Sequence, residues 1–336
     1  MMVCPQARPY SRFVLRIASL FILMTVICGG YLRAESPPFK SYTTEEGLAH
    51  DNVNKIVRDS RGFLWFCTAE GLSRFDGSRF TNFTTDHGLP HRDVNELFEL
   101  KDGSYLIGTA GGLVVFDPYG KPYEWNIRDQ RLEITAGEPP MFRTFAPDAP
   151  IRQSKVILSI AELNDGKLLI GTAYGLFRAE RINGEIRFEE IDIENGLKAG
   201  FYSLYNDSEG GVIAVTSHGI YRIKDGGVNL VDRIGAHSIT RAADGRIWVG
   251  ASGAPTGIRV YELSNGKLDL VERYTMKDGL ISDTFQYSIC QFADGRIFVG
   301  LGNGFQEFVP GENGSRGTFR TISNDIVLSL AQDPVG

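Results

Sequence analysis

The sequence has few of the side chains on which most metal and redox chemistry depends. Only four cysteines and five histidines occur among 336 residues, and none forms a CxxC or HExxH motif. A glycine-rich phosphate loop and the G-x-S-x-G nucleophile motif are also missing. The sequence therefore lacks the common zinc, nucleotide and serine hydrolase motifs, and we predict no metal and no cofactor.

Cysteine is scarcer still outside the N-terminus. Cys4 and Cys28 lie in the leader described below, which leaves Cys67 and Cys290. Both fall within apolar runs that are typical of strands. We therefore expect two buried free thiols rather than a disulfide.

The one long hydrophobic run is confined to the N-terminus. A basic stretch at 8–16 precedes an apolar run at 17–30, and an LRA tripeptide follows, which predicts a signal peptide over residues 1–34. An uncleaved membrane anchor is the alternative, although the run is short for a full span. Cys28 would also allow a lipoprotein, but the residue before it, Ile27, stands where such signals carry a small side chain.

Positive charge is in deficit as well. Removing the leader's four arginines from the 35 basic residues leaves 31 against 41 acidic residues, a net charge of −10. An acidic exported chain is a poor candidate for binding nucleic acid, so no nucleic-acid partner is predicted.

Glycine, in contrast, is abundant at 39 residues and punctuates an internal repeat. A turn glycine, usually preceded by aspartate, opens six similar apolar runs that read GFLWFCT, GSYLIGT, GKLLIGT, GGVIAVT, GRIWVGA and GRIFVGL. These glycines are Gly62, Gly103, Gly166, Gly210, Gly245 and Gly295, on average about 47 residues apart. The spacing is typical of propeller or solenoid units.

Each copy contains the signals of a β-meander. Asp-Gly between two apolar runs favours a hairpin turn, and the short branched and aromatic run that follows is typical of a strand buried on both faces. A Gly-Leu or Gly-Ile pair then makes the next turn, and two further strands complete the copy. Four short antiparallel strands every 40 to 50 residues are typical of a propeller blade.

We therefore predict an all-β fold: a seven-bladed β-propeller of four-stranded antiparallel blades over residues 35–336, with the last blade truncated. The last copy begins at 323–336 and stops where its Asp-Gly hairpin starts, so the sequence looks truncated and ring closure should be weak. FKSYTT at 39–44 is expected to be the outermost strand of this last blade. The other blades are predicted at about 45–85, 86–146, 147–192, 193–232, 233–275 and 276–322.

One segment interrupts the repeat. Residues 119–140 form a long insertion between the third and fourth strands of the second blade, with Pro and Gly at both ends. Propeller geometry would place it on the face that carries the Asp-Gly hairpins. We expect a loop or hairpin there, and contact with a partner is the alternative.

Propellers concentrate binding groups at the mouth of the central channel. Two kinds of loop meet there: those from an outermost strand to the next innermost strand, and those between second and third strands. A solvent-exposed ring of hydrogen-bonding side chains at the channel mouth suits a polar ligand such as a saccharide. The alternative is that the aspartates cap inner strands while the others face water. The candidate residues are His50, Asp51, Glu70, His91, Arg92, Asp93 and His218.

The repeat resembles the two-component regulator propeller family. The clearest match is GLAHDNVNKIVRDSRGFLWFCTAEGLSRFDG at 47–77, and GLPHRDVNELFELKDGSYLIGTAGGLVVFD at 88–117 is nearly as good. The family pattern has a GL-x₄-V strand, a D-x-x-G turn, LW-x-GT and GL-x-x-F-D-G. Cys67 replaces the usual glycine of the GT pair. The resemblance covers roughly 39–333, nearly all of the mature chain.

The resemblance implies a non-enzymatic, ligand-sensing input domain on the periplasmic side of a bacterial signal-transduction receptor. Members often have two propellers, a small β-sandwich, a transmembrane helix and an output module such as a histidine kinase or diguanylate cyclase. Their ligands are often glycans. For this chain the resemblance implies a glycan or other polar ligand, receptor modules downstream, an inner-membrane anchor and a homodimer in the full-length form.

Two other functions remain open at this stage. A propeller enzyme, such as a lyase resembling streptogramin-opening enzymes or a glycan hydrolase, needs a histidine or an acid/base pair over the channel. His218 and Glu70 are the candidates for that role. A protein-interaction scaffold would instead use residues 119–140 as its contact.

Overall fold

The computed structural model describes residues 40–118, 124–126, 131–133, 141–194, 196–252, 257–282, 286–312 and 315–332. The chain divides into two compact units, residues 1–42 and 43–336, and the fold described below is that of the second. The predicted signal peptide lies outside the described residues.

Six four-stranded antiparallel sheets make up this unit, and in each of them the strands pair with their neighbours in a meander. The first blade contains β1 (Val53–Arg58), β2 (Leu64–Thr68), β3 (Gly71–Phe75) and β4 (Phe80–Phe83). The second contains β5 (Val94–Glu99), β6 (Tyr105–Thr109), β7 (Gly112–Phe116) and β10 (Phe142–Phe145), and the third contains β11 (Ile157–Glu162), β12 (Leu168–Thr172), β13 (Gly175–Ile182) and β14 (Glu185–Ile191).

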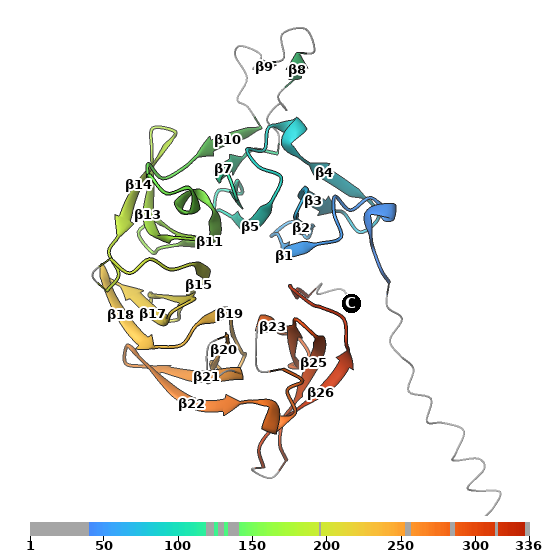
Figure 1. The fold of residues 1–336 in the computed structure, drawn as a ribbon, viewed down its shortest axis with the longest axis vertical. Coiled ribbons are helices and arrows are strands. Elements are labelled where there is room, and N and C mark those ends of the chain that lie inside the picture. Colours follow the sequence, from blue (N-terminus) through green and yellow to red (C-terminus); the bar gives the residue numbers. More distant parts are fainter. Residues whose placement is uncertain are drawn as a thin grey trace, which may run out of the picture. The chain divides into compact units, whose positions relative to one another are not determined.

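The remaining three sheets follow the same order. The fourth blade contains β15 (Phe201–Asn206), β16 (Val212–Thr216), β17 (Ile220–Lys224) and β18 (Gly227–Asp232). The fifth contains β19 (Ala236–Arg241), β20 (Ile247–Ala251), β21 (Gly257–Ser264) and β22 (Lys267–Tyr274), and the sixth contains β23 (Gln286–Gln291), β24 (Ile297–Leu301), β25 (Gly304–Val309) and β26 (Thr318–Ser323). Figure 1 shows the six sheets around a common axis, with the first strand of each innermost.

Glycine is needed at the turn between the second and third strands of a blade. Gly71 has a φ of +131°, and a Cβ built there would lie 2.5 Å from the carbonyl oxygen of Phe83 on β4. Any side chain would therefore push the fourth strand away. At the same turn of blade 2, Gly112 has a φ of +140°, and a Cβ there would lie 2.7 Å from the carbonyl oxygen of Phe145. These contacts explain why a Gly-Leu pair marks this point of the repeat.

The core lies between blades rather than inside any one of them. All five residues of β6, β12, β16, β20 and β24 are buried, because both faces of each second strand pack against a neighbouring blade. The GT glycine lies against the inner strand of the next blade: a Cβ at Gly171 would lie 2.7 Å from Phe201 Cβ. Cys67 occupies this position in blade 1 with no exposed surface.

The two cysteines are free, as predicted. Cys67 is buried, and burial raises the pKa of its thiol. Cys290 is only half-buried, so the prediction of complete burial is wrong for this residue. Burial nevertheless raises its pKa as well, which opposes formation of the reactive thiolate.

The prediction of seven blades is wrong, because the described residues form six four-stranded sheets. Residues 326–332 are not in a strand, although the sequence VLSLAQ at 327–332 is very similar to ILSIAE of the inner strand β11. The strand predicted at 39–44 is also not formed in the described part, where 40–43 is irregular and η1 (Thr44–Glu46) is a 3₁₀ helix. An antiparallel ladder needs a partner, and the described chain offers these two segments no second or third strand.

The insertion between the third and fourth strands of blade 2 is found where it was predicted. It contains a two-stranded antiparallel sheet of β8 (Glu124–Asn126) and β9 (Arg131–Glu133). β10 returns after it to pair with β7, so the blade tolerates the insertion without losing a strand. The other residues of 119–140 lie outside the described part.

Candidate ligand-binding site at the central channel

The loops that enter the inner strands repeat one local structure. η1, η2 (Thr85–His87) and η4 (Met276–Asp278) each follow a threonine that forms a capping box, and each ends at a glycine in the left-handed region. The remaining 3₁₀ helix of the described chain, η3 (Arg152–Lys155), lacks a side-chain cap. The capping boxes satisfy backbone N–H groups that would otherwise be unpaired, which fixes the loops that carry the predicted site residues.

Two of the predicted histidines have equivalent local roles. His50 Nδ1 accepts a hydrogen bond from the backbone N–H of Asn52 at 2.9 Å. His91 Nδ1 accepts one from the N–H of Asp93 at 3.0 Å in the next blade. Each ring therefore fixes the entry of the chain into an innermost strand, and only the other ring nitrogen is left to face a ligand.

The predicted acidic residues are held in separate contacts. Asp51 accepts a hydrogen bond from the N–H of Thr44 at 2.8 Å, and Asp93 accepts one from Asn54 Nδ2 at 2.9 Å. These contacts are structural but differ from the predicted strand caps: Asp51 holds η1, and Asp93 holds a side chain on the inner strand of blade 1.

The remaining predicted residues are partly brought together. Glu70 and Arg92 form an ion pair of 2.7 Å between the loops of blades 1 and 2. His218 lies on an exposed turn of blade 4 with its Nδ1 2.7 Å from Ser217 Oγ. In the described chain no group of three or more His, Cys, Asp or Glu residues could hold a metal ion.

A cavity of about 260 Å³ lies deeper in the channel, and every inner strand contributes to its lining. The shared feature is a β-bulge: in all six inner strands the register shifts around the second residue. A bulge leaves one residue out of the ladder and re-aims its side chain. The bulged residues that line the cavity are Asn54, Asn95, Leu158, Tyr202, His237 and Tyr287, and Leu328 joins them.

The lining differs between the two sides of the channel. On blades 4 to 6 it is aromatic: the rings of Tyr202 and His237 have centroids 4.1 Å apart, and Tyr287 follows at 6.4 Å from His237. On blades 1 and 2 it is made of amides. Asn54 Nδ2 donates to Asp93 and to the carbonyl of Val94, and Asn95 Nδ2 donates to the carbonyl of Ile157. The amide nitrogens are thus fixed toward the neighbouring blade.

Two further groups set the electrostatics of the cavity. Burial lowers the pKa of His237, so its imidazole is neutral at neutral pH and acts as an aromatic ring. Lys55 lines the cavity and forms an ion pair with the buried Glu96 on the next inner strand. Burial raises the pKa of Glu96, and the charge of Lys55 acts against that rise.

The sequence predictions missed the channel residues. Their signal was present, because one polar or aromatic residue follows the first residue of five of the six inner strands; Leu158 is the exception. Such a residue looks like an ordinary core or edge position unless the bulge is known. The repeat alone therefore located the strands but not the side that each residue faces.

Comparisons with known proteins agree with the repeat and the fold. The model of the two component regulator propeller matches residues 47–70, within the copy quoted above. No curated protein matches. In the described part of the chain no helix is long and apolar enough to cross a membrane.

Solved propeller structures are similar at low sequence identity. An inactive variant of virginiamycin B lyase from Staphylococcus aureus has a TM-score of 0.58 and 14% identity, covering 80% of this chain and 83% of that chain. A periplasmic gluconolactonase from Pseudomonas aeruginosa has a TM-score of 0.57 and 14% identity, covering 83% and 87%. The extracellular domain of a putative hybrid two component system from B. thetaiotaomicron has a TM-score of 0.42 and 16% identity, covering 80% of this chain and 42% of that one.

Proposed function

We propose that the chain, whose residues 47–70 match the model of the two component regulator propeller, is a non-enzymatic ligand-sensing domain of a bacterial receptor. The ligand that fits its channel is a small polyhydroxylated molecule such as a sugar ring. The observation that carries this proposal is the cavity of about 260 Å³ with an aromatic wall facing an amide wall.

The chemistry of the two walls supports this ligand class. The C–H face of a sugar ring packs on the electron-rich face of an aromatic ring, which Tyr202, His237 and Tyr287 supply. Its hydroxyl groups can donate to the side-chain carbonyl oxygens of Asn54 and Asn95 on the opposite side, since the amide nitrogens of both residues donate to the neighbouring blade. A cation at Lys55 would favour a ligand that carries oxygen acceptors.

The proposal places the domain in the periplasm of a receptor whose other modules lie outside this chain. Ligand binding would bias a two-state output only through different affinities for the two states. Homodimerisation of the full-length receptor belongs to the same proposal, and no nucleic-acid partner does.

Binding to the purified protein tests the ligand class. A panel of mono- and oligosaccharides should contain compounds that raise the melting temperature, since a ligand at 100 times its Kd stabilises by about 2.7 kcal/mol. Tyr202→Ala and His237→Ala should weaken binding at least tenfold. His218→Ala, a histidine change outside the cavity, should leave it unchanged.

The outcomes separate the channel from its mouth. Loss of binding in His218→Ala with intact binding in Tyr202→Ala would move the site to the loops predicted from the sequence. The absence of any stabilising compound in the panel would contradict the proposal.

An enzyme is the second candidate, since the similar structures include a lyase and a lactonase. Those likenesses show the fold alone. Glu70 on blade 1 is ion-paired with Arg92, whereas His218 on blade 4 lies beside Ser217, so the two candidate residues are held in separate contacts rather than as an acid/base pair. Incubation with polysaccharides, lactones and streptogramins, with His218→Ala as control, tests it: turnover that is lost in the variant would favour the enzyme.

A further inference from the structure

The fourth strand of blade 5, β22, has a free outer edge. The strands of this blade follow the order β19, β20, β21 and β22, so β22 pairs only with β21 in the described part of the chain. Figure 1 shows β22 as the outermost strand of its blade. The outward N–H and C=O groups of an edge strand can pair with another strand, and proteins usually protect such an edge.

The equivalent strand of blade 3 is protected by charge, whereas β22 is not. The exposed residues of β14 are all charged, and they are Glu185, Arg187, Glu189 and Glu190. In β22 two adjacent aliphatic residues are exposed, Leu270 at 41% and Val271 at 43%. The strands β18 and β26 each expose one large apolar residue, Leu230 and Ile322, both at 36%. Among the described fourth strands, β22 therefore has the most apolar exposed edge.

The edge of β22 opens into a cleft of about 1190 Å³ beside blade 6. The guanidinium group of Arg316, which precedes β26 of blade 6, donates to the carbonyl oxygen of Arg273, so an outward backbone group of β22 faces this cleft. Met276 on η4, 58% exposed, adds an apolar side chain to the lining. Pockets for small ligands usually measure about 300–1,000 Å³. The size of this cleft and its position along a strand edge favour a segment of polypeptide instead.

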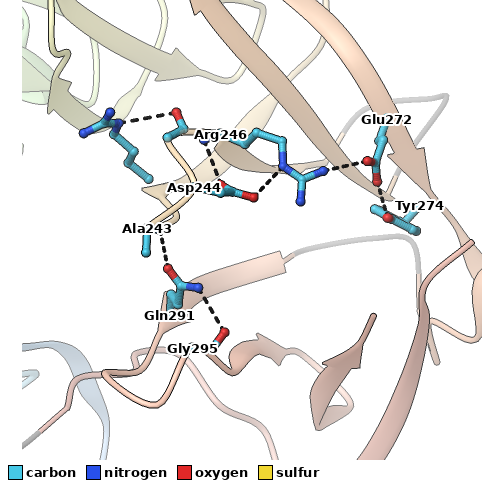
Figure 2. Close-up of polar contacts among 9 residues, drawn as sticks. Ala243, Asp244, Arg246, Glu272, Tyr274, Gln291 and Gly295 are labelled. Atoms are coloured by element: carbon cyan, nitrogen blue, oxygen red, sulfur yellow. Dashed lines mark hydrogen bonds and ion pairs between the residues drawn. The ribbon is translucent and has the colours of Figure 1, made fainter. Parts of the chain in front are cut away.

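The residues that line the cleft carry a surplus of positive charge. The four cations and two acids are Arg246, Arg273, Lys277 and Arg316 against Glu272 and Asp278. Both acids are already engaged, because Arg246 contacts Glu272 at 2.7 Å (Figure 2) and Arg316 contacts Asp278 at 2.5 Å. Arg273 Nε is buried without a hydrogen-bond acceptor among the described residues. In a chain whose net charge is −6, this local surplus favours a partner that brings carboxylates.

We propose that the outer edge of β22 is a docking site for an extended segment of a partner protein that contains apolar and acidic residues. The segment adds a fifth strand to blade 5 through main-chain hydrogen bonds. Its apolar side chains cover Leu270 and Val271, and its carboxylates lie near Arg273 and Lys277. This surface lies on the outside of the blade, away from the channel residues of the proposed sugar site.

A second copy of this chain fits the edge less well. Two identical edge strands pair antiparallel in a two-fold symmetric dimer. The end of β22 that carries Arg273 would then meet the end of the other β22 that carries Lys267. Like charges opposite each other destabilise strand pairing, so the occupant that the charges favour is a different, acidic polypeptide.

A synthetic peptide tests the edge directly. The probe is a peptide of alternating glutamate and valine with blocked ends, a pattern that favours an extended strand. A labelled probe should bind the purified chain saturably, and amide hydrogen exchange in β22 should slow about tenfold. Exchange in β18, which has a Leu-Val pair at its own outer edge but does not line the cleft, should not change.

Two control peptides separate the role of charge from that of strand pairing. Replacing every glutamate with lysine reverses the charge and should weaken binding about tenfold or more. Replacing the central valine with proline removes a backbone donor and disrupts the added strand, which should weaken binding about tenfold.

Variants of the protein locate the binding surface. Leu270→Asp and Lys277→Glu should each weaken binding of the probe about tenfold, which corresponds to about 1.4 kcal/mol. The matched controls are Leu230→Asp on β18 and Lys101→Glu on blade 2, both at exposed positions away from the cleft, and they should leave binding unchanged. Circular dichroism checks that the variants fold, and the exchange measurement on the unmodified chain does not depend on them.

Four results would overturn the proposal. Equal binding of the lysine peptide would show that charge does not select the partner, and equal binding of the proline peptide would show association without strand pairing. An absence of saturable binding would show that the edge accepts no strand. Self-association of the chain that Leu270→Asp abolishes would assign the edge to a second copy. Tyr202→Ala, which should weaken sugar binding, should leave peptide binding unchanged, so the two proposals can fail separately.

Discussion

The interfaces between blades 1 and 2 and between blades 5 and 6 are two versions of one structure. Each contains a tryptophan from a second strand packed among aromatic rings at matching positions of two blades. The first cluster contains Trp65, Phe83, Phe116 and Phe142, and the second contains Trp248, Tyr274, Phe308 and Phe319. The ring contacts lie between 4.9 and 6.3 Å in the first and between 4.9 and 5.8 Å in the second.

The polar group beside the tryptophan differs between them. Asp59, 2% exposed, accepts hydrogen bonds from Trp65 Nε1 at 2.8 Å and from Tyr105 OH of the next blade at 2.6 Å. Ala242 takes the place of Asp59 in blade 5. Trp248 Nε1 is accordingly buried without a hydrogen-bond partner among the described residues, at a cost of about 1–3 kcal/mol.

The second interface carries its polar contacts at the rim instead (Figure 2). Arg246 bridges Asp244 and Glu272, with both contacts at 2.7 Å, and Glu272 in turn accepts a hydrogen bond from Tyr274. A cleft of about 1190 Å³ borders this network. The same kind of aromatic cluster can therefore be supported by a buried carboxylate or by an exposed network of ion pairs. The two interfaces should respond differently to mutation, pH and salt.

The largest difference is expected from removing the aspartate at each interface. Asp59→Ala leaves Trp65 Nε1 and Tyr105 OH buried without an acceptor, so it should lower the free energy of unfolding by about 3 kcal/mol or more. Asp244→Ala removes an exposed ion pair and one exposed turn hydrogen bond from the N–H of Arg246, and should cost about 1 kcal/mol. Urea unfolding of both variants measures the difference, and equal losses would refute the comparison.

Introducing a buried aspartate at the second interface should make its hydrogen bonding, and its contribution to stability, more similar to those of the first. Ala242→Asp combined with Ile297→Tyr gives Trp248 an acceptor and gives that acceptor a second donor. We expect a gain of about 1 kcal/mol in the double variant. Ala242→Asp alone should gain less, because the buried carboxylate then has fewer donors. Chemical denaturation of the single and double variants, and a double-mutant cycle, test this.

Acid should weaken the first interface selectively. Burial alone would raise the pKa of Asp59, but hydrogen bonds from Trp65, Tyr105 and two backbone N–H groups outweigh it and lower the pKa below the ordinary value of 3.8. The stabilisation is therefore complete above the unfolded-state pKa and is lost as the pH falls through the folded-state pKa. The stability advantage over Asp59→Asn should be constant above about pH 5 and shrink below pH 4. An advantage that does not change with pH would show that the carboxylate charge is not involved.

Salt should produce the smallest effect, and only at the second interface. Arg246 is 31% exposed at its side chain, so its ion pairs are screened. Arg246→Ala should cost about 0.5–1 kcal/mol at low salt, and this cost should fall by half or more in 1 M NaCl. Trp65 and its anchor should show no such dependence. Thermal unfolding of both proteins at two salt concentrations checks this.

The sequence predicted the strands well because their signals are local. Turn glycines such as Gly71 and Asp-Gly pairs act within a few residues, so each blade could be recognised alone. The number of blades depends on pairing between distant segments. VLSLAQ at 327–332 has the sequence of an inner strand, yet without partner strands it forms no ladder.

The site was harder to predict because orientation depends on tertiary structure. His50 and His91 were chosen as ligand contacts, but each ring is engaged by its own backbone. His237 was passed over because it stands alone in the sequence. The bulge that turns its side chain toward Tyr202 and Tyr287 results from pairing with β20, and composition does not reveal it.

The place of Leu328 in the channel wall has a consequence for the proposed sensing role. Six sides of the cavity are hydrogen-bonded ladders, whereas the seventh, within the described residues, is held by a backbone hydrogen bond from Val327 to Leu301 and by the hydroxyls of Ser288 and Ser329. A segment held by single hydrogen bonds is displaced more easily than a strand within a ladder, so among the described residues this side of the cavity would resist a bound molecule least. Occupancy at the centre would then be converted into displacement at the seam between the first and last blades.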